Sequence, residues 1–408
     1  MFEALATIPA EELALRHERC RRLLRELAPE AGGLLVFART SVYYLTGTLG
    51  MGCVWLPLHG EPLLLLRKGL DRAALEAPSV RAVGYKSYKD LPGLAGEAGV
   101  PFPDCIAVDM AGLTWQLGDM LASRLANIRF VPGDLPLSVA QSLKSEWELA
   151  IMRHCGARHH MALHDVLPRA LKPGMTEREV AHLAWAVFYE LGHQGILRMN
   201  AFGEECFLGH VSAGDSGNYP SSFNGPLGLR GEHPAVPVMG YAGKVWKRGE
   251  PLGLDIGFQV EGYHTDKTQQ YWAGPEGSIP GEVASAHSFC MDVQAWAAEN
   301  LRPGALVSEI WAHVLKWAIK AGFGEGFMGL GENKVPFLGH GIGLAIDGWP
   351  AIAKGFDRPV EAGQCFALEP KHGIPGVGMV GVENTFEVRA SGPAACLTGD
   401  DYRMICVE

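Results

Sequence analysis

The chain has 408 residues, of which 48% are hydrophobic and 20% are charged, a composition typical of a globular protein. This length exceeds that of one ordinary hydrophobic core and predicts two or three domains. The formal net charge of −10 disfavours nucleic acids and anionic membrane surfaces as partners. We therefore expect neither a nucleic acid nor a membrane among the partners.

The N-terminal segment and the cysteines favour a cytoplasmic location. Residues 1–20 carry acidic residues where a secretory signal would be cationic, and they lack its apolar stretch. No apolar run long enough to span a membrane follows. The nine cysteines are dispersed, odd in number and free of any CxxC spacing. A reduced, cytoplasmic protein is the simplest interpretation.

Residues 1–140 alternate between helical and strand-like patterns. An amphipathic helix over residues 12–27 is followed by the strand-like runs GGLLVFAR, CVWLPLHGEPLLLL and IAVDM and by the helix-like TWQLGDMLASRLANI. This alternation indicates an α/β domain that ends near residues 131–134. Its acids and histidines are scattered, so the pattern predicts no catalytic site there.

Residues 141–408 contain two similar phrases, LKPGMTEREVAHLAWAVFYELG at 171–192 and LRPGALVSEIWAHVLKWAIKAG at 301–322. Each follows a long helical pattern and runs from LxPG to a glycine at the same spacing. In the first phrase Thr176 and Glu179 form a capping box that begins a helix. The repeated layout predicts an internal duplication, in which each half contains two helices joined by the LxPG turn and then strands.

The stretch GLDIGFQVEGYHTDKTQQYW, residues 253–272, predicts a β-hairpin that carries two acids. A two-residue turn at Glu261 and Gly262 would place Asp255 and Asp266 on one face as diagonal neighbours, roughly 7–8 Å apart. Apolar residues bracket Asp255, so we favour buried acids over the alternative of exposed acids in a sharp loop. Two buried like charges require a cation between them.

The second half repeats this feature. CFALEP places Glu369 in one strand-like run and MVGVENTFEV places Glu383 in another, with the Gly/Pro-rich KHGIPGVG as the connection between them. If the halves are related by a pseudo-two-fold axis, the two pairs of acids meet at the centre of one domain. A single acid on a strand is commonly structural, but four acids at duplicated positions predict a shared site.

A nitrogen ligand is available from VPFLGHGIGL, where glycines flank His340 and allow the backbone to approach closely. A histidine among glycines is more often structural, so its significance depends on the acids. Two divalent cations would neutralise four carboxylates, and we identify no basic run that would do so instead. Oxygen ligands with one imidazole suit Mn, Co, Fe or catalytic Zn. Such ions activate water, which predicts hydrolysis.

At this point the sequence resembles the pita-bread metallopeptidases, the family of methionine aminopeptidase, aminopeptidase P, prolidase and creatinase. The matching motifs are LDIG, GYHTD, GHGIGL, LEP and VEN, in this order, and YYLTG at 43–47 resembles the creatinase-type N-terminal domain. The resemblance implies an α+β fold, with a pita-bread domain of pseudo-two-fold symmetry at 141–408 after a smaller α/β domain at 1–140.

The resemblance also implies roles for the five residues. Asp255 would bind one metal ion, His340 and Glu369 would hold a second, and Asp266 and Glu383 would bridge both. Glu369 would in addition transfer the proton of the attacking water. Two-domain relatives of this type are dimers, so a homodimer is expected.

Three positions depart from the proline-directed members. Asp347 stands where a second histidine is usual, Val238 where a substrate-facing histidine is usual, and Gln269 where an arginine is usual. Residues 209–237 form a polar, Gly/Pro-rich segment of the kind that shapes pockets. The candidate substrate-binding residues are therefore His210, Asn224, His233 and Asp347, although ordinary loop structure is the commoner explanation for such loop residues.

Three functions are open at this stage. The first is an Xaa-Pro dipeptidase or aminopeptidase P type of dinuclear metallopeptidase that cleaves a small peptide. The alternative, motivated by Asp347 and Val238, is a hydrolase or lyase of a small non-peptide metabolite, as in creatinase. A non-catalytic binding module is the third, but such relatives usually lose metal ligands and this chain keeps all five.

Overall fold

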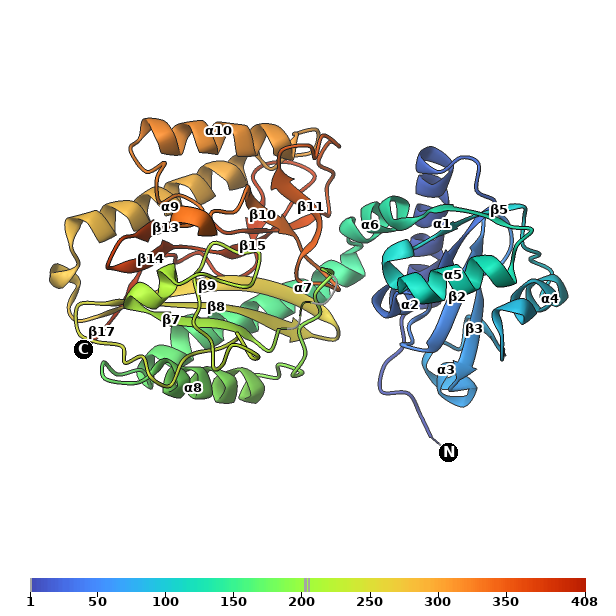
Figure 1. The fold of residues 1–408 in the computed structure, drawn as a ribbon, viewed down its shortest axis with the longest axis horizontal. Helices are drawn as coiled ribbons and strands as arrows, with labels where there is room; N and C mark the ends of the chain where they lie inside the picture. The colour runs from blue at the N-terminus through green and yellow to red at the C-terminus, as the bar shows by residue number, and fades with distance from the viewer. Residues whose placement is uncertain (1, 202–203, 205) are drawn as a thin grey trace. The chain divides into compact units, whose positions relative to one another are not determined.

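The computed structural model describes residues 2–201, 204 and 206–408, which form two compact units, Met1–Gln141 and Ser142–Glu408. Each unit has a β-sheet covered by helices (Figure 1). Over the described residues no helix is both long and apolar enough to cross a membrane.

The N-terminal unit is built on a six-stranded mixed sheet in the order β4-β3-β2-β1-β5-β6. β1 pairs antiparallel with β2 and parallel with β5. Apolar residues from the strands, among them Leu35, Trp55 and Ile106, form its core. The strands are β1 Gly33–Val36, β2 Met51–Pro57, β3 Leu63–Lys68, β4 Arg81–Gly84, β5 Cys105–Val108 and β6 Arg129–Pro132. The helices are α1 Ala10–Leu27, α2 Arg39–Thr46, α3 Leu70–Glu76, α4 Leu91–Glu97, α5 Trp115–Arg124 and α6 Asp134–Ser142.

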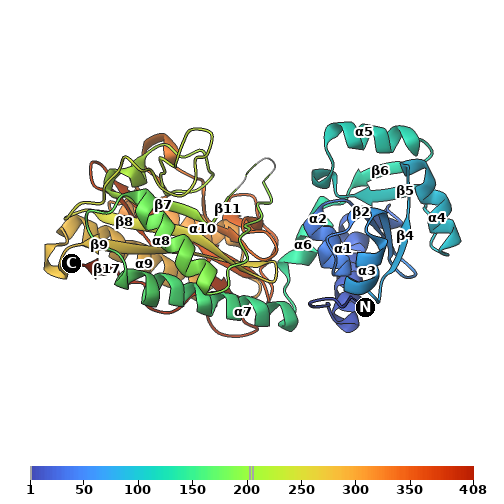
Figure 2. The same ribbon diagram turned by 90° about the horizontal axis from the view of Figure 1, so that it is seen from below.

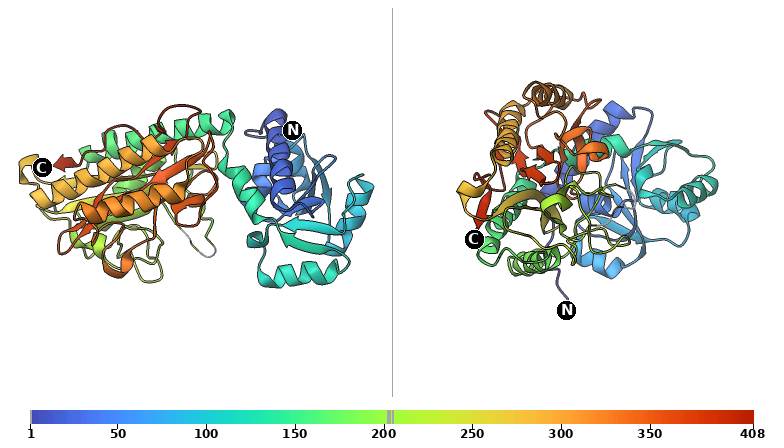
Figure 3. Two further views of the ribbon diagram at one scale, coloured as in Figure 1. Left: turned by 90° about the horizontal axis from the view of Figure 1, so that it is seen from above. Right: turned by 60° about the vertical axis from the view of Figure 1, so that its left-hand side comes forward.

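Four long helices cover the strands of the C-terminal unit on opposite sides. α7 and α8 lie over one side, in front of the strands in Figure 2, and α9 and α10 lie over the other, in front in the left view of Figure 3. The helices are α7 Glu146–His160, α8 Glu177–Glu190, α9 Gly281–Asn300 and α10 Val307–Lys320. The capping box of Thr176 and Glu179 is present at the start of α8, as predicted.

The strands of this unit form two main sheets, in the orders β17-β9-β8-β7 and β11-β10-β12-β15-β16, and a separate hairpin, β13-β14. The first sheet contains β7 Gly209–Ala213, β8 Pro251–Val260, β9 Tyr263–Ala273 and β17 Ile405–Val407. The second contains β10 Phe337–Gly341, β11 Gly348–Ala353, β12 Cys365–Leu368, β15 Asn384–Glu387 and β16 Ala395–Cys396. The hairpin consists of β13 Lys371–Ile374 and β14 Gly378–Gly381.

The two LxPG turns make the same backbone contact, as a duplication requires. The amide of Gly174 donates to the carbonyl of Trp246 at 2.7 Å, and that of Gly304 donates to the carbonyl of Val360 at 2.8 Å. In each half, the residue whose carbonyl accepts this hydrogen bond precedes the first acid by the same number of residues. Asp255 follows Trp246 at this spacing, and Glu369 follows Val360. The predicted internal duplication of the pita-bread domain is confirmed.

The hairpin of β8 and β9 has the predicted register. Val260 pairs with Tyr263, Gly257 with Asp266, and Asp255 with Thr268. Both turn residues, Glu261 and Gly262, have positive φ angles of 51° and 87°, which a two-residue hairpin turn of matching twist requires. The turn therefore fixes which face of the sheet receives the two acids.

The segment KHGIPGVG, predicted as a connection, instead forms the hairpin β13-β14, in which Lys371 pairs with Gly381. Pro375 and Gly376 lie in the turn, with Gly376 at a φ of 73°, and Gly373 and Gly378 on either side lie in the paired strands. Glu369 directly follows β12, and Glu383 directly precedes β15. Lys371, two residues after Glu369, is the first residue of β13.

The buried His193 is expected to make the stability of the C-terminal unit depend on pH. His193 packs against Phe188 and Phe258, and burial lowers its pKa from 6.5 to about 4. The folded protein disfavours the charged form of His193. Its contribution to the free energy of unfolding is therefore fully present above about pH 6.5 and is lost as the pH falls towards 4. We expect His193→Asn to remove about 3 kcal/mol of the pH dependence of unfolding between pH 7 and 4, measured with denaturant. An unchanged pH profile in the variant would contradict this.

Candidate metal centre

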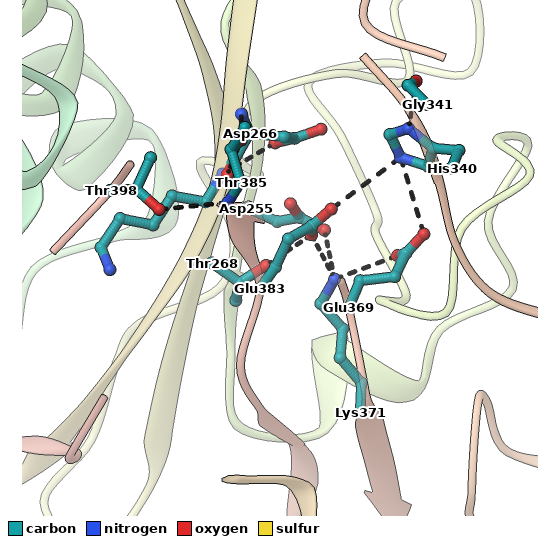
Figure 4. A network of polar contacts seen from close by, with 11 residues as sticks. Asp255, Asp266, Thr268, His340, Gly341, Glu369, Lys371, Glu383, Thr385 and Thr398 are labelled. Carbon is teal, nitrogen blue, oxygen red and sulfur yellow. Dashed lines mark hydrogen bonds and ion pairs between the residues drawn. The ribbon is translucent and has the colours of Figure 1, made fainter. Parts of the chain in front are cut away.

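The five residues expected to bind metal come together in the C-terminal unit (Figure 4). They lie on different strands or strand ends of the two sheets, which meet at this point through the backbone bond from Thr268 of β9 to Glu383 at 3.1 Å. The residues are Asp255 on β8, Asp266 on β9, His340 on β10, Glu369 after β12 and Glu383 before β15.

Most of this cluster is withdrawn from solvent. Asp266, Glu369 and Glu383 are buried, whereas the side chains of Asp255 and His340 are 15% and 18% exposed. Burying several carboxylates together is costly unless cations lie among them. The two partly exposed side chains mark where the cluster can be reached.

His340 faces the acids with one ring nitrogen. Its Nδ1 donates to the carbonyl of Gly341 at 3.2 Å, so Nε2 is the ring nitrogen that is left to bind a metal. Nε2 lies 3.7 Å from Oε1 of Glu369 and 3.9 Å from Oε1 of Glu383. One ligand atom each from Asp266, His340 and Glu383 lies within 4.8 Å of the others, close enough to hold a single ion.

A lysine that the sequence analysis did not predict lies on the other side of the two glutamates. Lys371 Nζ donates to Oε2 of Glu383 at 2.6 Å and to Oε2 of Glu369 at 3.2 Å, and it lies 3.2 Å from Oδ2 of Asp255. No basic run that would neutralise the acids was identified from the sequence, and this single lysine, which supplies one compensating positive charge, was missed. The sequence feature that could have predicted this contact is the position of Lys371 two residues after Glu369, because side chains two residues apart on a strand point to the same face.

Glu369 and Glu383 each divide their two oxygens between two cation positions. Both Oε1 atoms face His340 and both Oε2 atoms face Lys371. We call these positions the histidine side and the lysine side. Thr268 fixes the orientation of Glu383 by donating from Oγ1 to Oε2 at 3.0 Å.

The charges of the cluster perturb one another strongly. Burial acts to lower the pKa of Lys371, but Asp255, Glu383 and Glu369 outweigh it and hold the pKa well above its usual range. Burial opposes the ionisation of Asp255 too, yet Lys371 lowers its pKa to about 2. Asp266, farther from the lysine, has a pKa raised to about 7 by burial and by the charge of Asp255. One ammonium therefore does not neutralise the cluster, and the histidine side calls for another cation.

The donor set of the histidine side fits a divalent metal ion. It offers carboxylate oxygens and one imidazole nitrogen without thiolates, which suits Mn, Co, Fe or catalytic Zn. On the lysine side the three facing oxygens already contact the ammonium of Lys371. The residues present therefore fit a metal on the histidine side only.

The candidate substrate-binding residues lie in different surroundings. His210 is on β7 opposite Asp255, next to the cluster, with its ring 4.8 Å from that of Phe223. Asn224 is exposed, and the exposed His233 accepts a hydrogen bond from the amide of Ala235. Asp347 accepts hydrogen bonds from the backbone amides of Asn200 and Ala201.

The other two departures from the family pattern have structural surroundings. Val238 is partly buried against the hydrophobic core of the first sheet. Gln269 is buried on β9, and its Nε2 donates to the carbonyl of Arg403 at 3.0 Å, which ties the strand to the C-terminal segment. The hydrogen bonds and ion pairs of the acid cluster described above involve neither side chain.

Comparison with known proteins identifies both units. Residues 150–390 match the model of metallopeptidase family M24, and residues 16–139 match the creatinase/prolidase N-terminal domain. The Xaa-Pro dipeptidase of Pyrococcus horikoshii is 23% identical over 88% of this chain and 90% of its own length. That of Lactobacillus delbrueckii subsp. lactis is 28% identical over 59% of this chain, and the match spans 56% of that enzyme.

Solved structures share the fold over nearly the whole chain. A dipeptidase from Mycobacterium ulcerans has a TM-score of 0.79 at 22% identity and covers 98% of this chain and 100% of its own. An X-Pro aminopeptidase from Thermotoga maritima has a TM-score of 0.75 at 21% identity and covers 95% of this chain and 99% of its own. The two-domain pita-bread architecture is thus confirmed.

Proposed function

The chain belongs to metallopeptidase family M24, and from this premise we propose that it is a metal-dependent dipeptidase that cleaves Xaa-Pro dipeptides. The observation that carries the proposal is the histidine side, where ligand atoms of His340, Asp266 and Glu383 lie close enough together to hold one ion. Curated relatives named Xaa-Pro dipeptidase support this substrate class. A non-peptide metabolite as substrate is not favoured, because the relatives reported above are peptidases.

A divalent ion on the histidine side would supply a Lewis acid that activates water and polarises the scissile carbonyl. Glu369 is the residue that we propose as the proton carrier. Its Oε1 lies on the histidine side while Lys371 holds its Oε2 at 3.2 Å. Glu369 takes a proton from the attacking water and delivers it to the nitrogen of the departing proline.

Among the four candidate substrate-binding residues, we propose that His210 contacts the substrate. Its place opposite Asp255 and beside the ring of Phe223 supports this role. Asp347 contributes indirectly, because it holds the backbone at Asn200 and Ala201. Asn224 and His233 stay predictions that rest on the composition of their loop.

The native ion is proposed to be Mn, Co, Zn or Fe, as the oxygen-rich donor set suggests. The sequence predicted two ions per chain, a number that the position of Lys371 does not support. A homodimer and a cytoplasmic location are also proposed. The free state of all nine cysteines is consistent with a reducing compartment.

The direct test is turnover of a panel of Xaa-Pro dipeptides and tripeptides by protein loaded with Mn(II) or Co(II). We expect dipeptide cleavage that chelator treatment abolishes and metal restores. Dipeptides with alanine in place of the C-terminal proline serve as the control for specificity. No turnover of any peptide in the panel by metal-loaded protein would refute the proposed function.

A further inference from the structure

Lys371 places a fixed positive charge inside the acid cluster. Its side chain is 0% exposed, and its ammonium contacts Asp255, Glu369 and Glu383 at 2.6 to 3.2 Å. Lysines are almost never fully buried without partners, because removing the charge from water is costly. Three acids contributed by separate stretches of the chain provide such partners, so this ammonium is a built-in part of the centre.

The ammonium occupies the position that a metal ion on the lysine side would need. The three oxygens around Nζ are Oδ2 of Asp255 and the Oε2 atoms of Glu369 and Glu383, two glutamates whose Oε1 atoms face His340. A divalent metal bound to the same oxygens at about 2.0–2.2 Å would lie within the space of the ammonium. Two cations so close would also repel each other strongly in a buried site. The lysine side therefore accepts either the ammonium or a metal.

The histidine side is arranged differently. His340 Nε2 faces Oε1 of Glu369 and Oε1 of Glu383 at 3.7 and 3.9 Å, distances that exceed those of direct hydrogen bonds and leave room for an ion between them. The contacts of Lys371 are with Oε2 of each glutamate and not with Oε1. The two positions thus share the glutamates and differ in the cation that they can take.

We infer that this centre binds one divalent metal ion per chain, on the histidine side, and that the ammonium of Lys371 takes the place of a second ion. The inference rests on the proposed function in taking the cluster to be a metal centre. In this arrangement Asp255 pairs with the ammonium instead of binding a metal, which revises the role expected from sequence. Glu369 and Glu383 bridge a metal and an ammonium.

The test is a count of metal ions bound per chain. The protein would be stripped with chelator, reloaded with Mn(II), freed of excess metal by gel filtration and analysed by inductively coupled plasma mass spectrometry. We expect one ion per chain in the natural protein and two in Lys371→Ala, in which the lysine side is open. Two ions in the natural protein, or one in both proteins, would overturn the inference.

Lys267→Ala is the matched control. Lys267 is also buried and adjoins the cluster through Asp266, but its ammonium donates to Oδ1 of Asn384 at 2.7 Å. Its removal should leave one ion per chain. A count of two in this control would overturn the inference, because the second ion would then not depend on the lysine side.

A measurement on the natural protein alone covers the case in which Lys371→Ala does not fold. The electron paramagnetic resonance spectrum of the Mn(II)-loaded protein should be that of an isolated ion, and the spectrum of an exchange-coupled pair would overturn the inference. Peptide turnover in the same samples separates the two proposals. One ion without turnover contradicts the proposed function alone, and two ions with turnover contradict the inference alone.

Discussion

Replacing Glu369 by glutamine is expected to lower kcat for an Xaa-Pro dipeptide by about 10²–10⁴-fold, the usual contribution of a general acid–base group. The amide keeps the shape of the side chain and one oxygen that can face the metal, but it cannot accept the proton of water. KM should change much less, because the substitution acts on the chemical step. Steady-state kinetics on Mn(II)-loaded protein would measure both constants.

The metal content of the Glu369→Gln variant decides how the result is interpreted. If one ion is retained and kcat falls, the proton-carrying role is supported. A kcat within about threefold of the natural value would contradict that role, and loss of the ion would show that Glu369 acts mainly as a ligand. Glu309→Gln, on the exposed face of α10, is the control for an ordinary glutamate and should leave kcat unchanged.

Lys371→Met is expected to reduce the free energy of unfolding of the C-terminal unit by about 3–5 kcal/mol in the presence of chelator. Methionine fills a similar volume but leaves Asp255, Glu369 and Glu383 facing one another without the ammonium. Added Mn(II) should recover part of the loss, because an ion that binds only the folded protein stabilises it. Denaturant unfolding with and without metal would measure this difference.

Lys267→Met controls for the loss of a buried lysine in the same unit. Losing its side-chain hydrogen bond to Asn384 should cost less, and the cost should not depend on metal. Equal losses in the two variants, both insensitive to Mn(II), would contradict the view that Lys371 neutralises the acids. A larger, metal-sensitive loss in Lys371→Met supports it.

The sequence predicted the parts of the site that local rules determine. A two-residue turn at Glu261 and Gly262 fixes the register of β8 against β9, and the alternation of side chains then places Asp255 and Asp266 on one face. The repeated LxPG phrases located the corresponding acids of the second half. The duplication predicted that the four acids meet, and His340 was added as the nitrogen ligand that the glycine-flanked segment offers. The structure brings all five residues together.

The parts that were missed depend on pairing between segments distant in sequence. The high glycine and proline content of KHGIPGVG suggested a loop, so Lys371 was not considered as a strand residue facing the acids. Likewise residues 209–213 were assigned to a polar loop but form β7, because β8 offers them a partner edge. This pairing is what sets His210 opposite Asp255 and distinguishes it from Asn224 and His233.

Anomalous diffraction from crystals of the Mn(II)-loaded protein would test the metal centre most directly. We predict one manganese peak per chain, bonded to His340, Asp266, Glu369 and Glu383, with the ammonium of Lys371 still in contact with Asp255. A second peak bonded to Asp255, with Lys371 displaced, or no peak at the cluster would contradict this account.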